Sequence, residues 1–130
     1  MPNLVKINIF ADPSKPNPTL SLPDVPWYPG ITALQAMIIG EALHPQNFSF
    51  RVVYRSIFGA FVDSIDGLDD EHIPNHFWML FIDGQESPVG ASEAILPEDT
   101  TKTSTIVEWR YDDVSDGATG QAALKTRPLA

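Results

Sequence analysis

The residues best suited to chemistry gather between Asp63 and His72. This stretch holds five carboxylates and one imidazole, and hard oxygen ligands at close spacing are what calcium prefers. The Asp66–Gly67 pair comes too early for the spacing of a known calcium loop. A solvated acidic turn is therefore the simpler interpretation of this stretch.

Two histidines form a second candidate metal site. His72 and His76 are four residues apart, a spacing that on a helix would place both imidazoles on one face, as a zinc site needs. Pro74 lies between them and disfavours that helix because proline removes a backbone donor and clashes with the preceding turn. The sequence does not predict a zinc site here.

Nucleophilic catalysis has little support in the sequence. The chain has no cysteine, which excludes disulfides, thiolate nucleophiles and Cys-based metal sites. It also has no Gly-x-Ser-x-Gly elbow and no glycine-rich phosphate loop. Paired carboxylates for acid–base work stay open, because Asp and Glu are plentiful. We therefore favour a non-catalytic binding module and keep a small enzyme as an alternative.

Size and charge narrow the class of partner. The 130 residues suffice for one domain, and 17 acidic against 8 basic residues give a net charge of −9. This balance argues against nucleic acid and against anionic membrane surfaces. No apolar run approaches a membrane span, and Met1–Phe10 does not resemble a secretory signal. We expect a cytoplasmic chain as given, or the mature form of a secreted one.

Hydrophobic periodicity outlines an α+β domain with one helix on a mainly antiparallel sheet. Thr32 and Gln35 form a capping-box pattern at the start of a helix over Thr32–Leu43, and Asp66–Gly67 and Asp83–Gly84 are hairpin signals. The strands we expect are Asn3–Ala11, an edge strand near Thr19–Leu22, Phe48–Arg55, Phe61–Ile65, His76–Ile82, Val89–Ile95 and Thr105–Tyr111. Residues 1–112 form the domain, and Asp113–Ala130, which shows no apolar face, is expected to be a mobile tail.

The predicted core follows from the same pattern. The helix should bury a face made of Leu34, Met37, Ile38 and Ala42. Across the whole domain, the residues expected to be buried are Leu34, Ile38, Val52, Ile65, Phe77, Phe81 and Val107.

The strand His76–Ile82 carries large side chains on both of its faces. Phe77, Met79 and Phe81 alternate with His76, Trp78, Leu80 and Ile82. A sheet covered by one helix buries one face fully, so apolar residues on the other face indicate contact with a ligand or partner. A second packed layer, such as the Pro-rich segment Asp12–Pro29, is the equal alternative.

An ordered set of motifs resembles a known family. The motifs are Pro29-Gly-Ile-Thr32, Gly59-Ala-Phe-Val-Asp-Ser-Ile-Asp-Gly67, Phe77-Trp78, Asp83-Gly84, Val89-Gly90 and Trp109-Arg-Tyr111. In this order they resemble the C-terminal domain shared by transcobalamin and intrinsic factor, and a bacterial family of transcobalamin-like domains. The resemblance implies a β-grasp-like domain that, in the vitamin carriers, closes over cobalamin bound mainly by a separate helical domain.

The resemblance also implies ligand-binding residues. Phe61, Ser64 and Trp78 would face the ligand, with His76 close by and Met79 standing where the carriers have a Gln. If Trp78 lines a binding face, its indole should be partly exposed. The acidic run Asp69–Glu71 at the rim would favour neutral or cationic partners.

The hypothesis is thus a small-molecule or partner-binding module. Its implied cofactor is a cobalamin-like tetrapyrrole, although the chain contains no helical partner domain. Two alternatives are a small enzyme using carboxylate and His chemistry and a protein–protein adaptor acting through a sheet edge.

Overall fold

The structure is a computed structural model that describes residues 3–54, 59–97 and 104–126. Its elements are β1 (Leu4–Phe10), β2 (Leu20–Pro26), α1 (Ala33–Leu43), β3 (Phe50–Tyr54), β4 (Ala60–Ile65), β5 (Leu68–Asp69), β6 (His76–Ile82), β7 (Gln85–Glu86), β8 (Ser104–Asp113) and α2 (Gly120–Thr126). No helix in this part of the chain is long and apolar enough to cross a bilayer.

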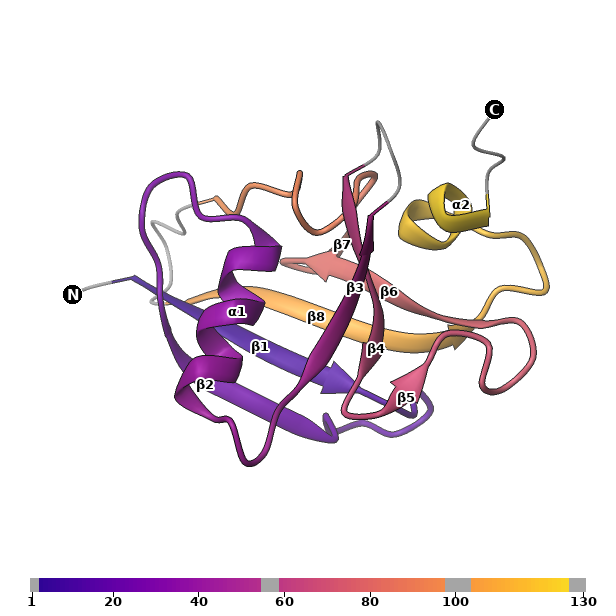
Figure 1. The fold of residues 1–130 in the computed structure, drawn as a ribbon, viewed down its shortest axis with the longest axis horizontal. Helices are drawn as coiled ribbons and strands as arrows, with labels where there is room; N and C mark the ends of the chain where they lie inside the picture. Colours follow the sequence, from indigo (N-terminus) through magenta and orange to yellow (C-terminus); the bar gives the residue numbers. More distant parts are fainter. Residues whose placement is uncertain (1–2, 55–58, 98–103, 127–130) are drawn as a thin grey trace.

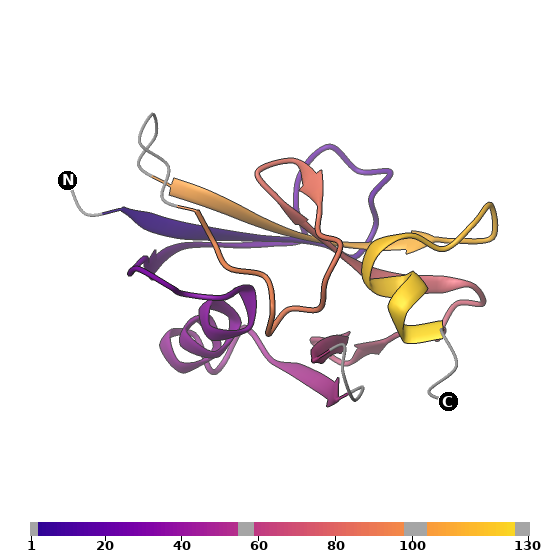
Figure 2. The same ribbon diagram turned by 90° about the horizontal axis from the view of Figure 1, so that it is seen from above.

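The elements form two layers, as Figures 1 and 2 show. One layer is a five-stranded sheet in the order β2-β1-β8-β6-β7, and the other contains α1 and a three-stranded sheet in the order β3-β4-β5. Among the strand pairs of the described residues, the central pair β1–β8 is parallel and the others are antiparallel. This confirms the α+β class and the mainly antiparallel pairing.

The strand β8 lies between β1 and β6 and alternates regularly along its length. Thr105, Val107, Trp109 and Tyr111 are buried, whereas the residues between them are only partly covered. Side chains of a strand alternate between its two faces, so these four point into the core between the layers. The sequence predicted the strand over Thr105–Tyr111 and the burial of Val107 within it, and both predictions are confirmed.

Helix α1 begins as the sequence predicts but buries a different face. The Oγ1 atom of Thr32 accepts a hydrogen bond from the Gln35 backbone N–H at 3.2 Å, and Oε1 of Gln35 accepts one from the Thr32 backbone N–H at 3.0 Å. The buried residues of the helix are Ala33, Ala36, Met37 and Gly40. Ile38 is 54% exposed and Ala42 is also exposed, so the prediction for these two positions is wrong.

The small residues of α1 explain why the helix buries this face and not the predicted one. A Cβ atom added at Gly40 would lie only 3.2 Å from Cδ1 of Leu22 and 3.3 Å from Cδ1 of Ile7. The helix can therefore approach the sheet closely through its Ala and Gly positions, which brings more of its surface into van der Waals contact. The larger Ile38 is left facing solvent.

The other residues of the predicted core fall into two groups, those that are buried and those that are only partly buried. Ile65, Phe77 and Val107 are buried as predicted, whereas Leu34, Val52 and Phe81 are only partly buried. Residues 89–95, predicted as a strand, make a single isolated bridge between Ile95 and Thr32. This prediction is wrong because the segment forms no ladder with a strand. Its backbone bonds go to α1 and the residues before it, with a single bond from the Ser92 N–H to the Ala60 carbonyl of β4.

The C-terminal segment differs from the expected mobile tail. Strand β8 runs on to Asp113, and α2 packs against β6 (Figure 1). Ala122 of α2 is fully buried and forms a second apolar cluster with Phe77 and Met79. The second packed layer over this part of β6 therefore comes from α2 and not from the Pro-rich segment, which contains the edge strand β2.

Replacing Trp78 by alanine tests the packing between the layers. The indole is 1% exposed, donates from Nε1 to the Leu68 carbonyl at 2.7 Å, and packs 5.2 Å from the Tyr111 ring between centroids. We expect Trp78→Ala to lower the free energy of unfolding by about 3–5 kcal/mol, because it empties a large core volume. Urea denaturation measures this loss.

Tyr54 provides the matched control for this experiment. Its side chain is 75% exposed on β3, so Tyr54→Ala should change the free energy of unfolding by no more than about 0.5 kcal/mol. A loss below about 1 kcal/mol for Trp78→Ala would contradict the core role of the indole.

Candidate functional site

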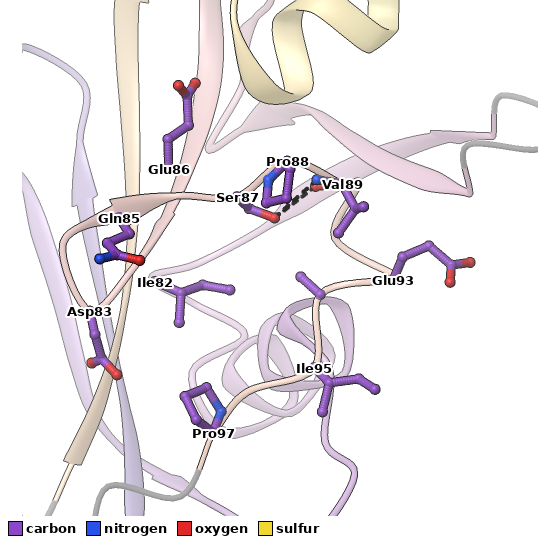
Figure 3. A pocket seen from close by; sticks show the side chains of 11 residues that line it. Ile82, Asp83, Gln85, Glu86, Ser87, Pro88, Val89, Glu93, Ile95 and Pro97 are labelled. Atoms are coloured by element: carbon purple, nitrogen blue, oxygen red, sulfur yellow. Dashed lines mark hydrogen bonds between the residues drawn. The ribbon is translucent and has the colours of Figure 1, made fainter.

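A groove of about 540 Å³ lies between the β6–β7 hairpin and the segment 87–97, which we call the groove loop. Figure 3 shows the side chains that surround it. They belong to Ile82, Asp83, Gln85, Glu86, Ser87, Pro88, Val89, Glu93, Ala94, Ile95 and Pro97.

The groove combines an apolar floor with an acidic rim. The apolar residues of the lining include Ile82, Val89, Ile95 and two prolines, and Ile95 is 67% exposed although it is large and aliphatic. Asp83, Glu86 and Glu93 supply three carboxylates. No Lys, Arg or His lines the groove within the described residues. An exposed isoleucine at a concave site indicates a surface that a ligand or partner can cover.

Hydrogen bonds to α1 and to the segment that precedes it hold one side of the groove loop in place. The Ala33 N–H donates to the Ala94 carbonyl at 2.8 Å, and the Leu96 N–H donates to the Ile31 carbonyl at 2.8 Å. Nε1 of Trp27 donates to the Leu96 carbonyl at 3.1 Å. The loop therefore keeps its shape through bonds distributed along its length.

Strand β4 fixes the other side of the loop. The Ala60 N–H donates to Oγ of Ser92 at 2.8 Å. A Cβ atom added at Gly90 would lie 2.7 Å from the Ala60 carbonyl oxygen and 2.9 Å from Cε1 of Phe61, so only glycine permits this close approach. The groove is thus preformed by packing, and Phe61 supports it from below.

The five residues implied by the family resemblance lie elsewhere. Phe61, Ser64, Trp78 and Met79 are buried, and His76 is partly exposed. The expectation that Trp78 is partly exposed is wrong, because its indole is enclosed in the core between the two layers. His76 and Trp78 do lie together, since both rings pack against Tyr111. Contact of these residues with a ligand stays a prediction.

None of these five residues lines the groove, and sequence reasoning missed those that do. The Asp83–Gly84 hairpin was the one available signal, because it identified one wall. The opposite wall was assigned to a strand, and no pattern in residues 87–97 indicates that they turn back toward the hairpin.

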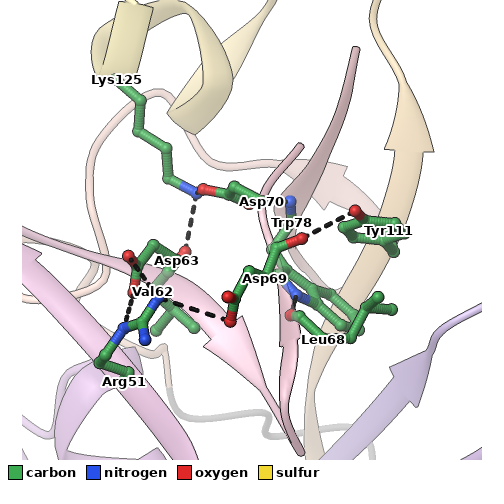
Figure 4. Close-up of polar contacts among 9 residues, drawn as sticks. All are labelled: Arg51, Val62, Asp63, Leu68, Asp69, Asp70, Trp78, Tyr111 and Lys125. Carbon is green, nitrogen blue, oxygen red and sulfur yellow. Dashed lines mark hydrogen bonds and ion pairs between the residues drawn. The ribbon is translucent and has the colours of Figure 1, made fainter. Parts of the chain in front are cut away.

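Three carboxylates of the acidic stretch Asp63–His72, those of Asp63, Asp69 and Asp70, are paired with cations in structural contacts (Figure 4). Nε of Arg51 lies 3.3 Å from Oδ1 of Asp63, and its Nη2 atom lies 3.4 Å from Oδ1 of Asp69. Oδ1 of Asp66 accepts the Ser49 N–H at 2.8 Å. No cluster of potential ligands suited to a metal ion occurs among the described residues.

The strongest charge contact in this region is a buried ion pair. Nζ of Lys125 lies 2.6 Å from Oδ2 of Asp70 and donates to the Val62 carbonyl at 2.7 Å, while Oδ1 of Asp70 accepts the Trp78 N–H at 2.8 Å. Burial raises the pKa of Asp70 and lowers that of Lys125, although each group favours the charged form of the other. The pair ties α2 to β4 and β6.

Comparison with known proteins places the chain in a family. Residues 32–112 match the family described as a domain of unknown function, DUF4430. Since this match covers well over half of the chain, the chain belongs to that family. No curated protein sequence matches it.

The fold is also found in a solved structure. The chain is similar to the crystal structure of haptocorrin in complex with Cbi, with a TM-score of 0.59 and 17% sequence identity. The similarity covers 85% of this chain and 26% of the haptocorrin chain. At this identity the likeness shows a shared, transcobalamin-like fold, and the chain spans about a quarter of the haptocorrin chain.

Removing one partner of the buried ion pair tests how α2 is held. We expect Lys125→Met to lower the free energy of unfolding by about 3–5 kcal/mol, because Asp70 is left buried without its cation. The double variant with Asp70→Asn should recover at least half of this loss. Equal stability of the single and double variants in urea denaturation would contradict the coupling.

The pH dependence of Lys125→Met follows from the raised pKa of Asp70. In the folded variant, the Asp70 carboxyl group loses the ammonium group that lowers its pKa, so its pKa rises further above that of the unfolded chain. The folded state then binds a proton at Asp70 more tightly than the unfolded state does. Proton uptake therefore stabilises the fold as the pH falls through the raised pKa. The stability deficit relative to the unmodified protein should be largest at neutral pH and should shrink toward acid pH.

Gly90→Ala tests whether the groove is preformed. Because the new methyl group would meet the Ala60 carbonyl and the Phe61 ring, we expect a loss of about 1–3 kcal/mol in the free energy of unfolding. The control is Gln85→Ala, which changes an exposed lining residue and should cost no more than about 0.5 kcal/mol. An unchanged melting temperature for Gly90→Ala would show that the groove loop shifts at little cost, and it would contradict a preformed groove.

Proposed function

We propose that the chain is a binding module whose ligand sits in the groove between the β6–β7 hairpin and the groove loop. The observation that carries this proposal is a preformed groove, lined by both apolar and acidic side chains, in a domain that shares its fold with part of haptocorrin. Its volume of about 540 Å³ falls in the range typical of small-molecule sites, roughly 300–1,000 Å³.

The nature of the ligand is narrowed by the size of the site. The haptocorrin structure is a complex with Cbi, and the present chain corresponds to 26% of that protein. A ligand as large as a tetrapyrrole needs extensive burial, so this domain would hold one only together with a second domain. A smaller ligand fits the groove by itself.

The residues implied by the family resemblance have a supporting part in this proposal. Phe61 packs beneath Gly90 and so fixes the groove loop. Ser64, Trp78 and Met79 are buried in the layers that carry the loop and the hairpin. His76, which is partly exposed, remains the one of the five that could meet a bound molecule without rearrangement of the core.

The enzyme alternative gains no support from the groove. The carboxyl group with a raised pKa, Asp70, lies outside the groove and is bonded to Lys125 and the Trp78 backbone. A raised pKa at such a pair is explained by burial in a structural contact.

Native mass spectrometry of the protein purified from its source organism tests the proposal. We expect a co-purifying small molecule whose affinity falls about tenfold in Ile95→Ser, because the substitution removes apolar contact area from the floor. Ile38→Ser is the matched control, since Ile38 is also more than half exposed but lies on α1 outside the groove. Equal retention of the molecule by both variants would place the site elsewhere.

A further inference from the structure

We propose that the groove selects a small molecule that carries a positive charge on an apolar body. This inference rests on the proposed function and adds the chemical class of the ligand. It follows from how the groove distributes apolar surface and charge.

The apolar part of the ligand is indicated by the floor. Ile82, Val89, Ile95 and Pro97 all line the groove, and Ile82 points from the hairpin toward the groove loop (Figure 3). Ile95 leaves 67% of its surface exposed to water in the free protein. Covering such surface is favourable by about 25 cal/mol per Å², so an aliphatic or aromatic body gains affinity there.

The positive charge is indicated by the rim. Asp83, Glu86 and Glu93 stand around the floor, and none of them forms an ion pair within the described residues. The hydrogen bonds they accept come from neutral donors: the Ile106 N–H to Asp83 at 2.9 Å and the Thr119 hydroxyl to Glu86 at 3.1 Å. The negative charge of the rim is therefore not compensated by the protein.

The contrast with the other acidic side chains supports this reading. Asp63 and Asp69 share Arg51, and Asp70 is paired with Lys125. Arg51 and Lys125 thus serve the acidic turn, Arg110 is paired with Glu108, and no cation of the described residues lines the groove. With a net charge of −9 for the chain, an anionic ligand would be repelled both locally and at longer range.

Glu86 is held in position before any ligand arrives. Its Oε2 atom accepts the Thr119 hydroxyl, and a Cβ atom added at Gly120 would lie 2.5 Å from the same oxygen. The start of α2 therefore closes against this side chain and limits its freedom. A carboxylate that is already ordered loses little entropy when it meets a cation.

Three probes with the same alkyl chain and different head groups test the inference. Methyl NMR signals of Ile82 and Ile95 report binding of n-octylammonium, 1-octanol and n-octyl sulfate below their micelle concentrations. We expect n-octylammonium to bind about tenfold more tightly than 1-octanol and n-octyl sulfate to bind more weakly than 1-octanol. The advantage of the cation should shrink in about 0.5 M salt, because exposed charges are screened.

Charge-neutralising variants provide the second test. Glu86→Gln and Glu93→Gln should each weaken n-octylammonium binding about threefold and leave 1-octanol binding unchanged. Glu71→Gln is the matched control, because Glu71 is exposed and lies outside the groove. It should change the affinity for either probe by less than the groove variants do.

The outcomes separate this inference from the proposed function. If 1-octanol binds as tightly as n-octylammonium, or n-octyl sulfate binds more tightly, the charge selectivity is wrong and the groove remains a ligand site. If no probe shifts the Ile82 and Ile95 signals, both proposals fail. Binding of a blocked peptide of alternating lysine and leucine without binding of n-octylammonium would assign the groove to a protein partner. Concentration-dependent shifts without any probe would assign it to a second copy of the chain.

Discussion

The structure depends on covering the apolar face of the five-stranded sheet. Helix α1 has 11 residues and is therefore only about 16 Å long, which is too short to cover five strands. Its Ala and Gly positions let it pack closely over β1 and β2, but the end of the sheet that carries Trp78 and Tyr111 lies beyond it. The sheet β3-β4-β5 covers that end, and this second cover accounts for the two-layer fold.

The sheet β3-β4-β5 brings polar groups to the edge of the core. The turn between β4 and β6 carries carboxylates, and one of them, Asp70, is mostly buried beside the backbone of Trp78. A buried carboxylate without a partner would be costly, and Lys125 from α2 supplies that partner while its own charge is buried in return. The short C-terminal helix is thus part of the domain, held by an ion pair and by the contact of Ala122 with β6.

The groove also results from the need to cover the apolar face of the five-stranded sheet. Between α1 and β4 the core is closed by the groove loop, whose inner side chains Ala91, Ala94 and Leu96 are buried. Because some side chains of this loop point into the core, others must point outward, and Val89, Glu93 and Ile95 line the groove. A concave site with fixed walls arises because its inner surface belongs to the core.

The sequence by itself determined the local elements. The capping box of α1, the bounds of β6, the alternation of β8 and the turns at Asp66–Gly67 and Asp83–Gly84 were all predictable, and both turns show the positive φ angles that such pairs adopt. These features depend on neighbouring residues and on the period of a strand. Tertiary structure decided which face of α1 is buried and where α2 packs. It also decided that Trp78 is enclosed and that residues 89–95 form a wall of the groove instead of a strand. Each of these depends on contacts between residues far apart in the chain, such as Lys125 with Asp70 and Gly90 with Phe61, and the local pattern of apolar and polar residues does not specify such pairs.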